Sequence, residues 1–135
     1  MDQTEARSRL ERARVARFAS ITPDGRPHLV AITYAVIDDA VVHMVDDKPK
    51  TTIELQRLTN VKTNPRASLL VDNYSDDWAT LWWVRVDGHV EVDTAGERWE
   101  RARTALQEKY PQYRDPPRGA AIFLSIDRIS HWVGS

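Results

Sequence analysis

Residues 18–33 read FASITPDGRPHLVAIT, and this stretch decides the fold. The TPDG at residues 22–25 places proline and glycine where a tight turn needs them, between two β-like segments. It predicts a β-hairpin with a first strand over Ala16 to Thr22 and a second strand over Arg26 to Val36. Because the second strand is almost wholly apolar after His28, we expect it to be buried on both faces.

The rest of the chain inserts helices between further antiparallel strands. Residue pairs with capping-box spacing predict the starts of three helices. The first covers about residues 3 to 14, the second runs from Thr51 to the helix-ending Asn64-Pro65, and the third runs from Thr94 to Tyr110. The other strands are expected at residues 40–45, 66–74, 81–92 and 120–126, the last extended to residue 132. This order predicts a mainly β (α+β) fold, a small antiparallel split β-barrel with about three helices in a single domain over residues 1–135.

Composition excludes several classes of protein. The 135 residues carry 19 Lys and Arg against 20 Asp and Glu, so a partner held mainly by phosphate electrostatics, such as nucleic acid, is disfavoured. The absence of cysteine excludes disulfides and thiolate metal sites, and the five glycines make no GxGxxG or GxxxxGK loop. Neither a secretory signal nor a membrane-spanning stretch is present. We therefore expect a soluble, cytoplasmic protein with no nucleic-acid or membrane partner.

The first candidate site is Lys48-Pro49-Lys50, directly before the helix that Thr51 caps. Helix N-termini expose unpaired amides and a partial positive charge, so two lysines there suit a phosphate or a carboxylate. The alternative is that both lysines are solvated loop charges.

The second candidate site is DDWATLWWVR, residues 76–85, which holds three of the five tryptophans. Adjacent residues of a strand face opposite ways, so if Trp82 enters the core, Trp83 and Arg85 share the other face. An indole beside a guanidinium suits a planar anionic ligand or a subunit interface. The alternative is ordinary packing.

No catalytic side chain or metal-ligand set is expected. The four histidines lie at scattered positions without metal-ligand spacing, and no nucleophile motif such as GxSxG is present. An enzyme of this kind needs a cofactor to carry the difficult chemical step, which favours redox work.

Four segments together resemble a known family. They are FASITPDGRPHLVAIT, the DDKPK loop with its helix, NPRASLLVDNY and LWWVRVDGHVEV, and they cover most of residues 18–92. The chain resembles the flavin-binding split barrels related to pyridoxamine 5′-phosphate oxidase (PNPOx-like proteins). Within them it looks like the actinobacterial branch that uses the deazaflavin coenzyme F420.

The resemblance implies a homodimer with the cofactor in a groove between the subunits. Lys50 and Lys48 fall where the family's basic loop grips the cofactor phosphate, and Arg57 lies where many relatives place a further cation. The ring of the cofactor is expected along Val30, Ala31 and Ile32. The cofactor-binding residues predicted in all are Val30, Ala31, Ile32, Lys48, Lys50, Thr51, Arg57, Trp83 and Arg85.

Two departures from the family favour F420 over FMN. Pyridoxamine phosphate oxidases have an arginine in the strand that here reads LVAIT, and an Arg-Gln-Val-Arg run where this chain has Trp82-Trp83-Val84-Arg85. We therefore expect an oxidoreductase, a reductase that passes a hydride from reduced deazaflavin to a small, electron-poor organic acceptor. The alternatives are an FMN-binding oxidase-like protein, a non-enzymatic carrier of a flavin, deazaflavin or haem-like ligand, and an OB-like single-strand binder, which the net charge disfavours.

Overall fold

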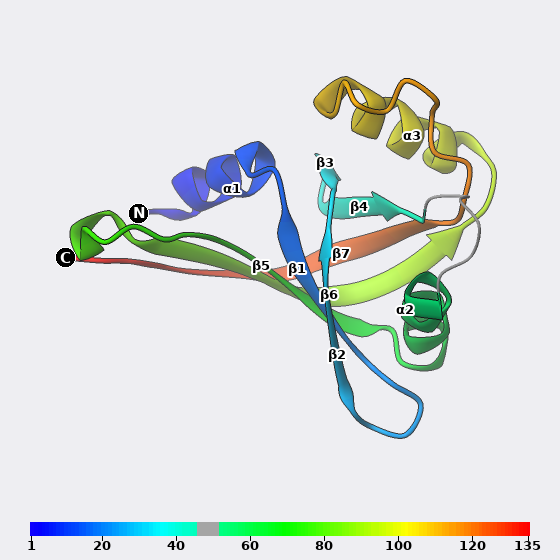
Figure 1. Cartoon of the computed structure of the whole chain (residues 1–135), viewed down its shortest axis with the longest axis horizontal. Helices are drawn as coiled ribbons and strands as arrows, with labels where there is room; N and C mark the ends of the chain where they lie inside the picture. The colour runs from blue at the N-terminus through cyan, green and yellow to red at the C-terminus, as the bar shows by residue number, and fades with distance from the viewer. Residues whose placement is uncertain (46–51) are drawn as a thin grey trace.

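The computed structural model describes residues 1–45 and 52–135, and its strands form one strongly curled sheet with helices around it (Figure 1). In chain order the elements are α1 (Gln3–Arg12), β1 (Ala16–Ile21), β2 (Pro27–Ile32), β3 (Ala35–Ile37), β4 (Ala40–Met44), α2 (Thr52–Thr63), β5 (Arg66–Asn73), the 3₁₀ turn η1 (Trp78–Thr80), β6 (Trp82–Asp93), α3 (Glu97–Lys109) and β7 (Ala121–Val133). The two termini lie at the same end of the molecule, at the left of Figure 1. The predicted split-barrel fold with three α-helices is confirmed for the described residues.

The sheet curls because its two edge strands are neighbours in the chain. The strand order is β2-β1-β5-β6-β7-β4-β3, and every pair is antiparallel. Strands β2 and β3 are separated only by Thr33 and Tyr34, so the chain itself joins one edge of the sheet to the other. Such curling leaves little free sheet edge exposed to other chains.

The predicted hairpin forms, but its second strand differs from the expectation. The turn is closed by the Thr22 amide donating to the Arg26 carbonyl at 2.8 Å, and Gly25 adopts a φ of +86°. The single strand expected from Arg26 to Val36 is instead two strands, β2 and β3. Burial on both faces was a wrong prediction, because β2 is an edge strand covered on one face, and Leu29 on its other face is 67% exposed.

The sequence predicts the start of α1 correctly and the start of α3 incorrectly. Asp2 caps α1, its side chain accepting from the Glu5 amide at 2.8 Å, as the sequence predicts. The third helix begins at Glu97 behind Gly96, whose φ is +104°, and not at a cap formed by Thr94. The Thr51 cap of α2 lies outside the described residues.

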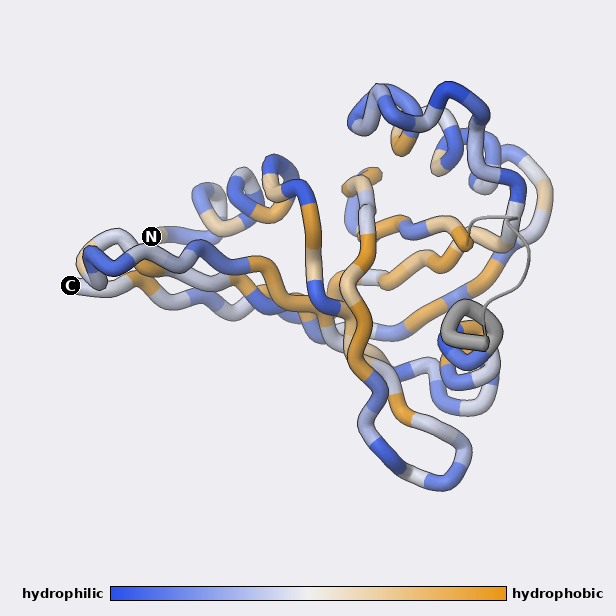
Figure 2. Tube along the Cα trace, in the orientation of Figure 1, coloured by the Kyte–Doolittle hydropathy of each residue, from blue (hydrophilic) through white to orange (hydrophobic). Residues whose placement is uncertain are grey.

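The core consists of two apolar clusters. The larger one joins α1, α2 and the inner faces of β1, β2, β5, β6 and β7, and the smaller one packs α3 on β3, β4 and β7. Hydrophobic residues concentrate in the strands, whereas most residues of α1 and α3 are hydrophilic (Figure 2). Among the described residues, none of the helices is both long enough and apolar enough to span a bilayer.

The pairing of β6 with β7 is irregular at Gly88, where the sequence predicts a bulge or a bend. The register with β7 shifts between Asp87 and Gly88, and a Cβ at position 88 would lie 1.9 Å from the Ser125 carbonyl oxygen. No other residue type fits this close backbone approach without movement of the sheet.

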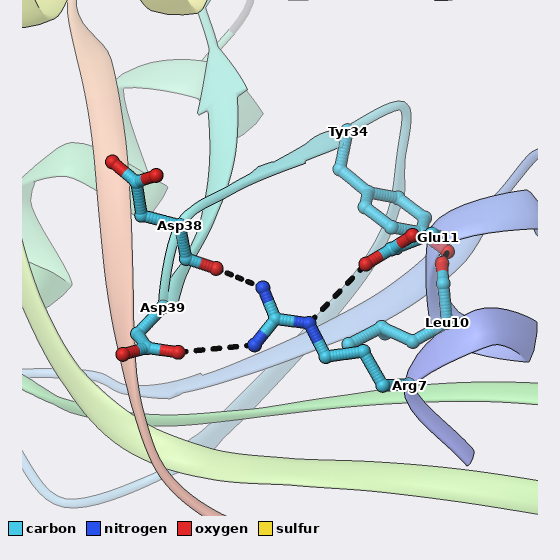
Figure 3. Close-up of polar contacts among 6 residues, drawn as sticks. All are labelled: Arg7, Leu10, Glu11, Tyr34, Asp38 and Asp39. Carbon is cyan, nitrogen blue, oxygen red and sulfur yellow. Dashed lines mark hydrogen bonds and ion pairs between the residues drawn. The ribbon is translucent and has the colours of Figure 1, made fainter. Parts of the chain in front are cut away.

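Side chains of α1 tie it to the barrel (Figure 3). The Arg7 guanidinium donates to the Asp38 carbonyl, to the Asp39 carboxylate at 3.0 Å and to Glu11 at 3.2 Å. The hydroxyl of the fully buried Tyr34 donates to the Leu10 carbonyl on the same helix. These contacts hold the middle of α1 against the turn between β3 and β4, and its C-terminal part against the junction of β2 and β3.

Candidate cofactor-binding site

Strand β6 presents an indole and a guanidinium on the outer face of the sheet. Val84 and Val86 on the same strand are fully buried, so Trp83 and Arg85 point away from the core. The Arg85 guanidinium carbon lies 5.9 Å from the centroid of the Trp83 ring. The prediction that Trp83 and Arg85 share one face, opposite the buried valines, is confirmed.

The strand register brings Ala31 to the same face. Arg85 pairs with Leu70, Leu70 pairs with Arg17, and Arg17 pairs with Ala31. Directly paired residues of a sheet point to the same side. The structure therefore aligns the candidate ring strand β2 with Arg85 in one row across four strands.

A cavity of about 400 Å³ lies over this row. Its floor is mainly aliphatic, and two guanidiniums and an indole stand at its sides. The residues that line it are Arg17, Ala19, Leu29, Ser68, Leu69, Leu70, Trp83 and Arg85. Arg17, Leu29, Ser68 and Leu70 were not among the predicted site residues, because placing them beside Arg85 requires the pairing register.

A second cavity of about 520 Å³ continues along the same face, and Ala19 and Ser68 line both cavities. It is more polar than the first. The Ser68 hydroxyl donates to Asp87 at 2.6 Å, Arg85 donates to Asp87 at 3.2 Å, and His89 Nδ1 lies 3.1 Å from Asp127. The two cavities together form one outer groove, apolar at the Trp83 end and ionic at the His89 end.

The other two residues of the candidate ring strand point inward. Ile32 is buried in the main core, and Val30 packs against it. Their side chains stabilise the barrel. Of the three predicted strand residues, Ala31 lies on the outer face of the sheet, where it pairs with Arg17.

Arg57 lies in the interior and apart from the outer groove. Its side chain is 6% exposed, and its guanidinium donates to Nε2 of His43 on β4. The other ring nitrogen of His43, Nδ1, lies 2.8 Å from the Thr33 carbonyl oxygen. Burial, with the Arg57 charge as a second cause, lowers the pKa of His43 to about 3, so the imidazole is neutral. Nδ1 then carries the hydrogen and Nε2 accepts from Arg57.

The predicted residues Lys48, Lys50 and Thr51 lie outside the described residues. The structure thus places Trp83 and Arg85 side by side at the outer groove, aligns Ala31 in the same row of the sheet, and places Arg57 in a separate buried contact with His43. His43 was missed as a candidate, since a single histidine in a strand gives no sequence signal that distinguishes a buried bridge from ordinary packing.

Thr33 and Tyr34, which separate β2 from β3, are held by two tyrosines, one at the C-terminal end of α3 and one in the loop after it. The Thr33 hydroxyl lies 2.9 Å from the Tyr113 hydroxyl, and Tyr110 bonds both the amide and the carbonyl of Tyr34, at 3.1 and 3.0 Å. The strand that borders the outer groove is therefore fixed at its end by several independent hydrogen bonds.

Chemically, the outer groove suits binding and orientation. Apolar walls favour a planar ring, and flanking guanidiniums favour anionic or hydrogen-bond-accepting groups on it. Within residues 1–45 and 52–135, His, Asp and Glu side chains do not gather in a group of three that could hold a metal ion.

Comparison with known proteins agrees with this architecture. A conserved hypothetical protein from Mycobacterium tuberculosis has a TM-score of 0.81 and 26% identity, covering 98% of this chain and 85% of that chain. An FAD-binding protein from Mesorhizobium loti has a TM-score of 0.72 and 21% identity over 97% of this chain and 94% of that one. A heme binding protein from Mycobacterium smegmatis has a TM-score of 0.71 and 23% identity over 96% of this chain and 57% of that one.

Sequence comparison assigns the family. None of the curated proteins matches this sequence significantly. The family model described as pyridoxamine 5′-phosphate oxidase matches residues 3–133, nearly the whole chain. The chain therefore belongs to the pyridoxamine 5′-phosphate oxidase family.

Proposed function

We propose that this protein is an F420-dependent reductase that binds the deazaflavin at the outer groove and reduces a small, electron-poor organic acceptor. The observation that carries this proposal is the cavity of about 400 Å³ with an aliphatic floor and Trp83, Arg17 and Arg85 at its sides. Membership of the family and the likeness to an FAD-binding protein support a flavin-type ligand.

The residues present fit such a ring. Leu29 and Leu70 supply apolar surface, and Trp83 supplies an aromatic edge or face for stacking. Arg17 and Arg85 would donate hydrogen bonds to carbonyl oxygens or ring anions of a deazaflavin. Lys48 and Lys50 remain the proposed partners of the cofactor phosphate.

Bound reduced F420 would supply the hydride, and the chain would supply position and electrostatics. The row from Ala31 to Arg85 would hold the ring plane against β2. The aliphatic floor would exclude water from the side of the ring that faces the protein. The residues of the chain would orient the cofactor and the acceptor, and holding two reactants in the correct geometry contributes strongly to the rate.

The choice of F420 over FMN rests on the sequence of β2 and β6. The β2 strand has no arginine between Pro27 and Ile32, and β6 begins with Trp82-Trp83-Val84-Arg85 in place of a run that contains glutamine. Flavin binding of the FMN or FAD type is the second candidate, and the FAD-binding neighbour favours it.

We further propose that two copies pair across the outer groove. Leu29 is 67% exposed on the edge strand β2, and it lines the apolar part of the cavity. A second chain would cover this surface and supply the opposite wall of the groove.

A titration of the purified protein with F420, FMN and FAD, followed by tryptophan fluorescence, tests the proposal. F420 is expected to quench the emission at lower concentration than FMN or FAD, and the Trp83→Phe variant is expected to lose much of this signal. Equal or tighter FMN binding would replace the F420 assignment with the flavin alternative. If F420 binds but the protein does not reduce nitroaromatic or quinone acceptors, the protein is a carrier of the cofactor and not a reductase.

A further inference from the structure

A second concave site lies outside the outer groove, where α1 runs into β1. It is a cavity of about 280 Å³ whose polar lining is dominated by arginine. The side chains that matter here are Arg9, Arg12, Arg14, Arg17, Asp72 and Trp82. We call this cavity the arginine groove.

Positive charge in the arginine groove exceeds the negative charge that balances it. Arg9 lies 2.9 Å and Arg12 lies 3.6 Å from the same Glu5 carboxylate oxygen, so these two cations share one anion. Arg17 pairs with Asp72 at 3.4 Å. Arg14 donates to the Lys109 backbone carbonyl at 2.8 Å, and no carboxylate partner of Arg14 is found in the described part of the chain.

The excess charge is not needed to cap the helix. Cations near a helix C-terminus often serve the unpaired carbonyls there. In α1 two of these carbonyls already have donors: the Arg9 carbonyl accepts from the Ala13 amide at 3.1 Å, and the Leu10 carbonyl accepts from the Tyr34 hydroxyl. The guanidiniums of Arg9 and Arg12 instead contact the single Glu5 carboxylate, so this group keeps a net positive charge that another anion can balance.

Two further contacts hold the arginine groove in shape. The Arg9 guanidinium carbon lies 5.0 Å from the Trp82 ring centroid, and that of Arg14 lies 4.7 Å from the Tyr110 ring centroid. Stacking on aromatic rings restrains long side chains and reduces the entropy lost when a ligand binds. The positive potential also reaches Lys109, whose pKa is lowered to about 8 by burial and, second, by the charge of Arg14.

We propose that the arginine groove binds a small polyanion that carries two or more phosphate or carboxylate groups. Forked guanidiniums match the geometry of both groups. A concave site of about 280 Å³ suits a compact ligand. A membrane surface or a nucleic-acid backbone needs an extended basic face, which a chain with net charge −1 does not favour.

The arginine groove and the outer groove are adjacent, since Arg17 lines both cavities. The proposal does not rest on the identity of the cofactor. Arg12 lines the arginine groove and not the outer groove, so a change at Arg12 separates the two sites.

The test is a calorimetric titration of the cofactor-free protein with pyrophosphate and with citrate at low ionic strength, which distinguishes a phosphate from a carboxylate preference. Arg12→Gln removes an exposed guanidinium, 68% accessible in its side chain. Arg101→Gln is the matched control, because Arg101 is 54% exposed on α3 and pairs with Asp38 away from the groove.

We expect at least one of the two polyanions to bind, and we expect Arg12→Gln to weaken that binding by about 10-fold. Arg101→Gln should leave the affinity within about 2-fold of the wild type, and both variants should keep the circular dichroism spectrum of the wild type. The proposal is overturned if neither polyanion binds with a Kd below about 10 mM, or if both variants weaken binding equally. Binding of an oligonucleotide or of phosphatidylglycerol vesicles without binding of either small polyanion would also overturn it.

Discussion

The guanidinium of Arg57 on α2 donates to the imidazole of His43 on β4, and the same ring donates through Nδ1 to the Thr33 carbonyl 2.8 Å away. This buried chain of contacts connects the helix that follows the predicted phosphate loop to the end of the strand predicted to carry the cofactor ring. One histidine therefore links α2 to the end of β2 through the interior of the protein.

Replacement of His43 should destabilise the fold. His43→Leu removes the donor to the Thr33 carbonyl and one acceptor of the Arg57 guanidinium, and each buried loss costs about 1 to 3 kcal/mol. We expect the free energy of unfolding, measured in urea, to fall by about 2 to 4 kcal/mol. His43→Gln, which keeps a donor and an acceptor, should cost clearly less, and an equal loss in both variants would contradict the role given to these hydrogen bonds.

The pH dependence of stability should reveal the same histidine. The pKa of His43 is lowered from 6.5 to about 3 in the fold, so between these values the unfolded chain binds a proton that the folded protein does not. Stability from this group is complete above pH 6.5 and is lost as the pH falls toward 3, by about 1.4 kcal/mol per pH unit. The stability difference between wild type and His43→Gln should therefore shrink as the pH is lowered through this window. A constant difference would show that His43 is protonated in the folded protein.

Arg85 should contribute to cofactor affinity and little to stability. Its side chain is 44% exposed in the free chain, and its guanidinium lies beside Trp83 at the cavity wall. Arg85→Gln is expected to raise the Kd for F420 by about 10-fold or more, the cost of one charge-assisted hydrogen bond. Arg128→Gln, an exposed change on β7 that does not line either cavity of the outer groove, should leave the Kd unchanged. An equal effect of both would mean that net charge, and not position, sets the affinity.

Leu29 should control assembly. A lysine at this exposed position costs the isolated chain about 0.5 kcal/mol or less, but it places a charge in the proposed interface. Light scattering should therefore give a dimer mass for the wild type and a monomer mass for Leu29→Lys. Thr104→Lys introduces the same charge on the exposed surface of α3 and should remain dimeric. A wild-type monomer at micromolar concentration would remove the basis for a groove between subunits.

Lys50 should act on binding without acting on folding. As a loop lysine before α2, it is predicted to make a charge-assisted hydrogen bond to the cofactor phosphate, which is worth about 1.5 to 3 kcal/mol. Lys50→Ala is expected to weaken F420 binding by about 10-fold to 150-fold with little change in melting temperature, and Lys50→Arg should keep most of the affinity. If Lys48→Ala weakens binding and Lys50→Ala does not, the phosphate lies nearer the first lysine. If neither does, the cofactor phosphate is bound elsewhere.

The sequence alone predicted the features that depend on local chemistry. The TPDG turn specifies the β1–β2 hairpin because proline and glycine satisfy the backbone angles of that turn whatever surrounds it. Trp83 and Val84 face opposite sides because side chains alternate along a strand, and the irregular pairing at Gly88 is possible because glycine has no Cβ. The resemblance of the segments between residues 18 and 92 was sufficient to identify the family.

Only the tertiary structure decided which distant residues meet. Arg17 and Arg85 flank one cavity because β5 lies between β1 and β6, a pairing that no local pattern encodes. Leu29 is exposed because it lies on the outer face of β2, whereas its apolar neighbours in sequence had predicted burial on both faces. The contact between Arg57 and His43 likewise depends on how α2 packs on the barrel. Periodicity fixes the side of a strand on which a residue lies, but burial and proximity depend on which strand becomes its neighbour, and that is determined by the packing of the whole chain.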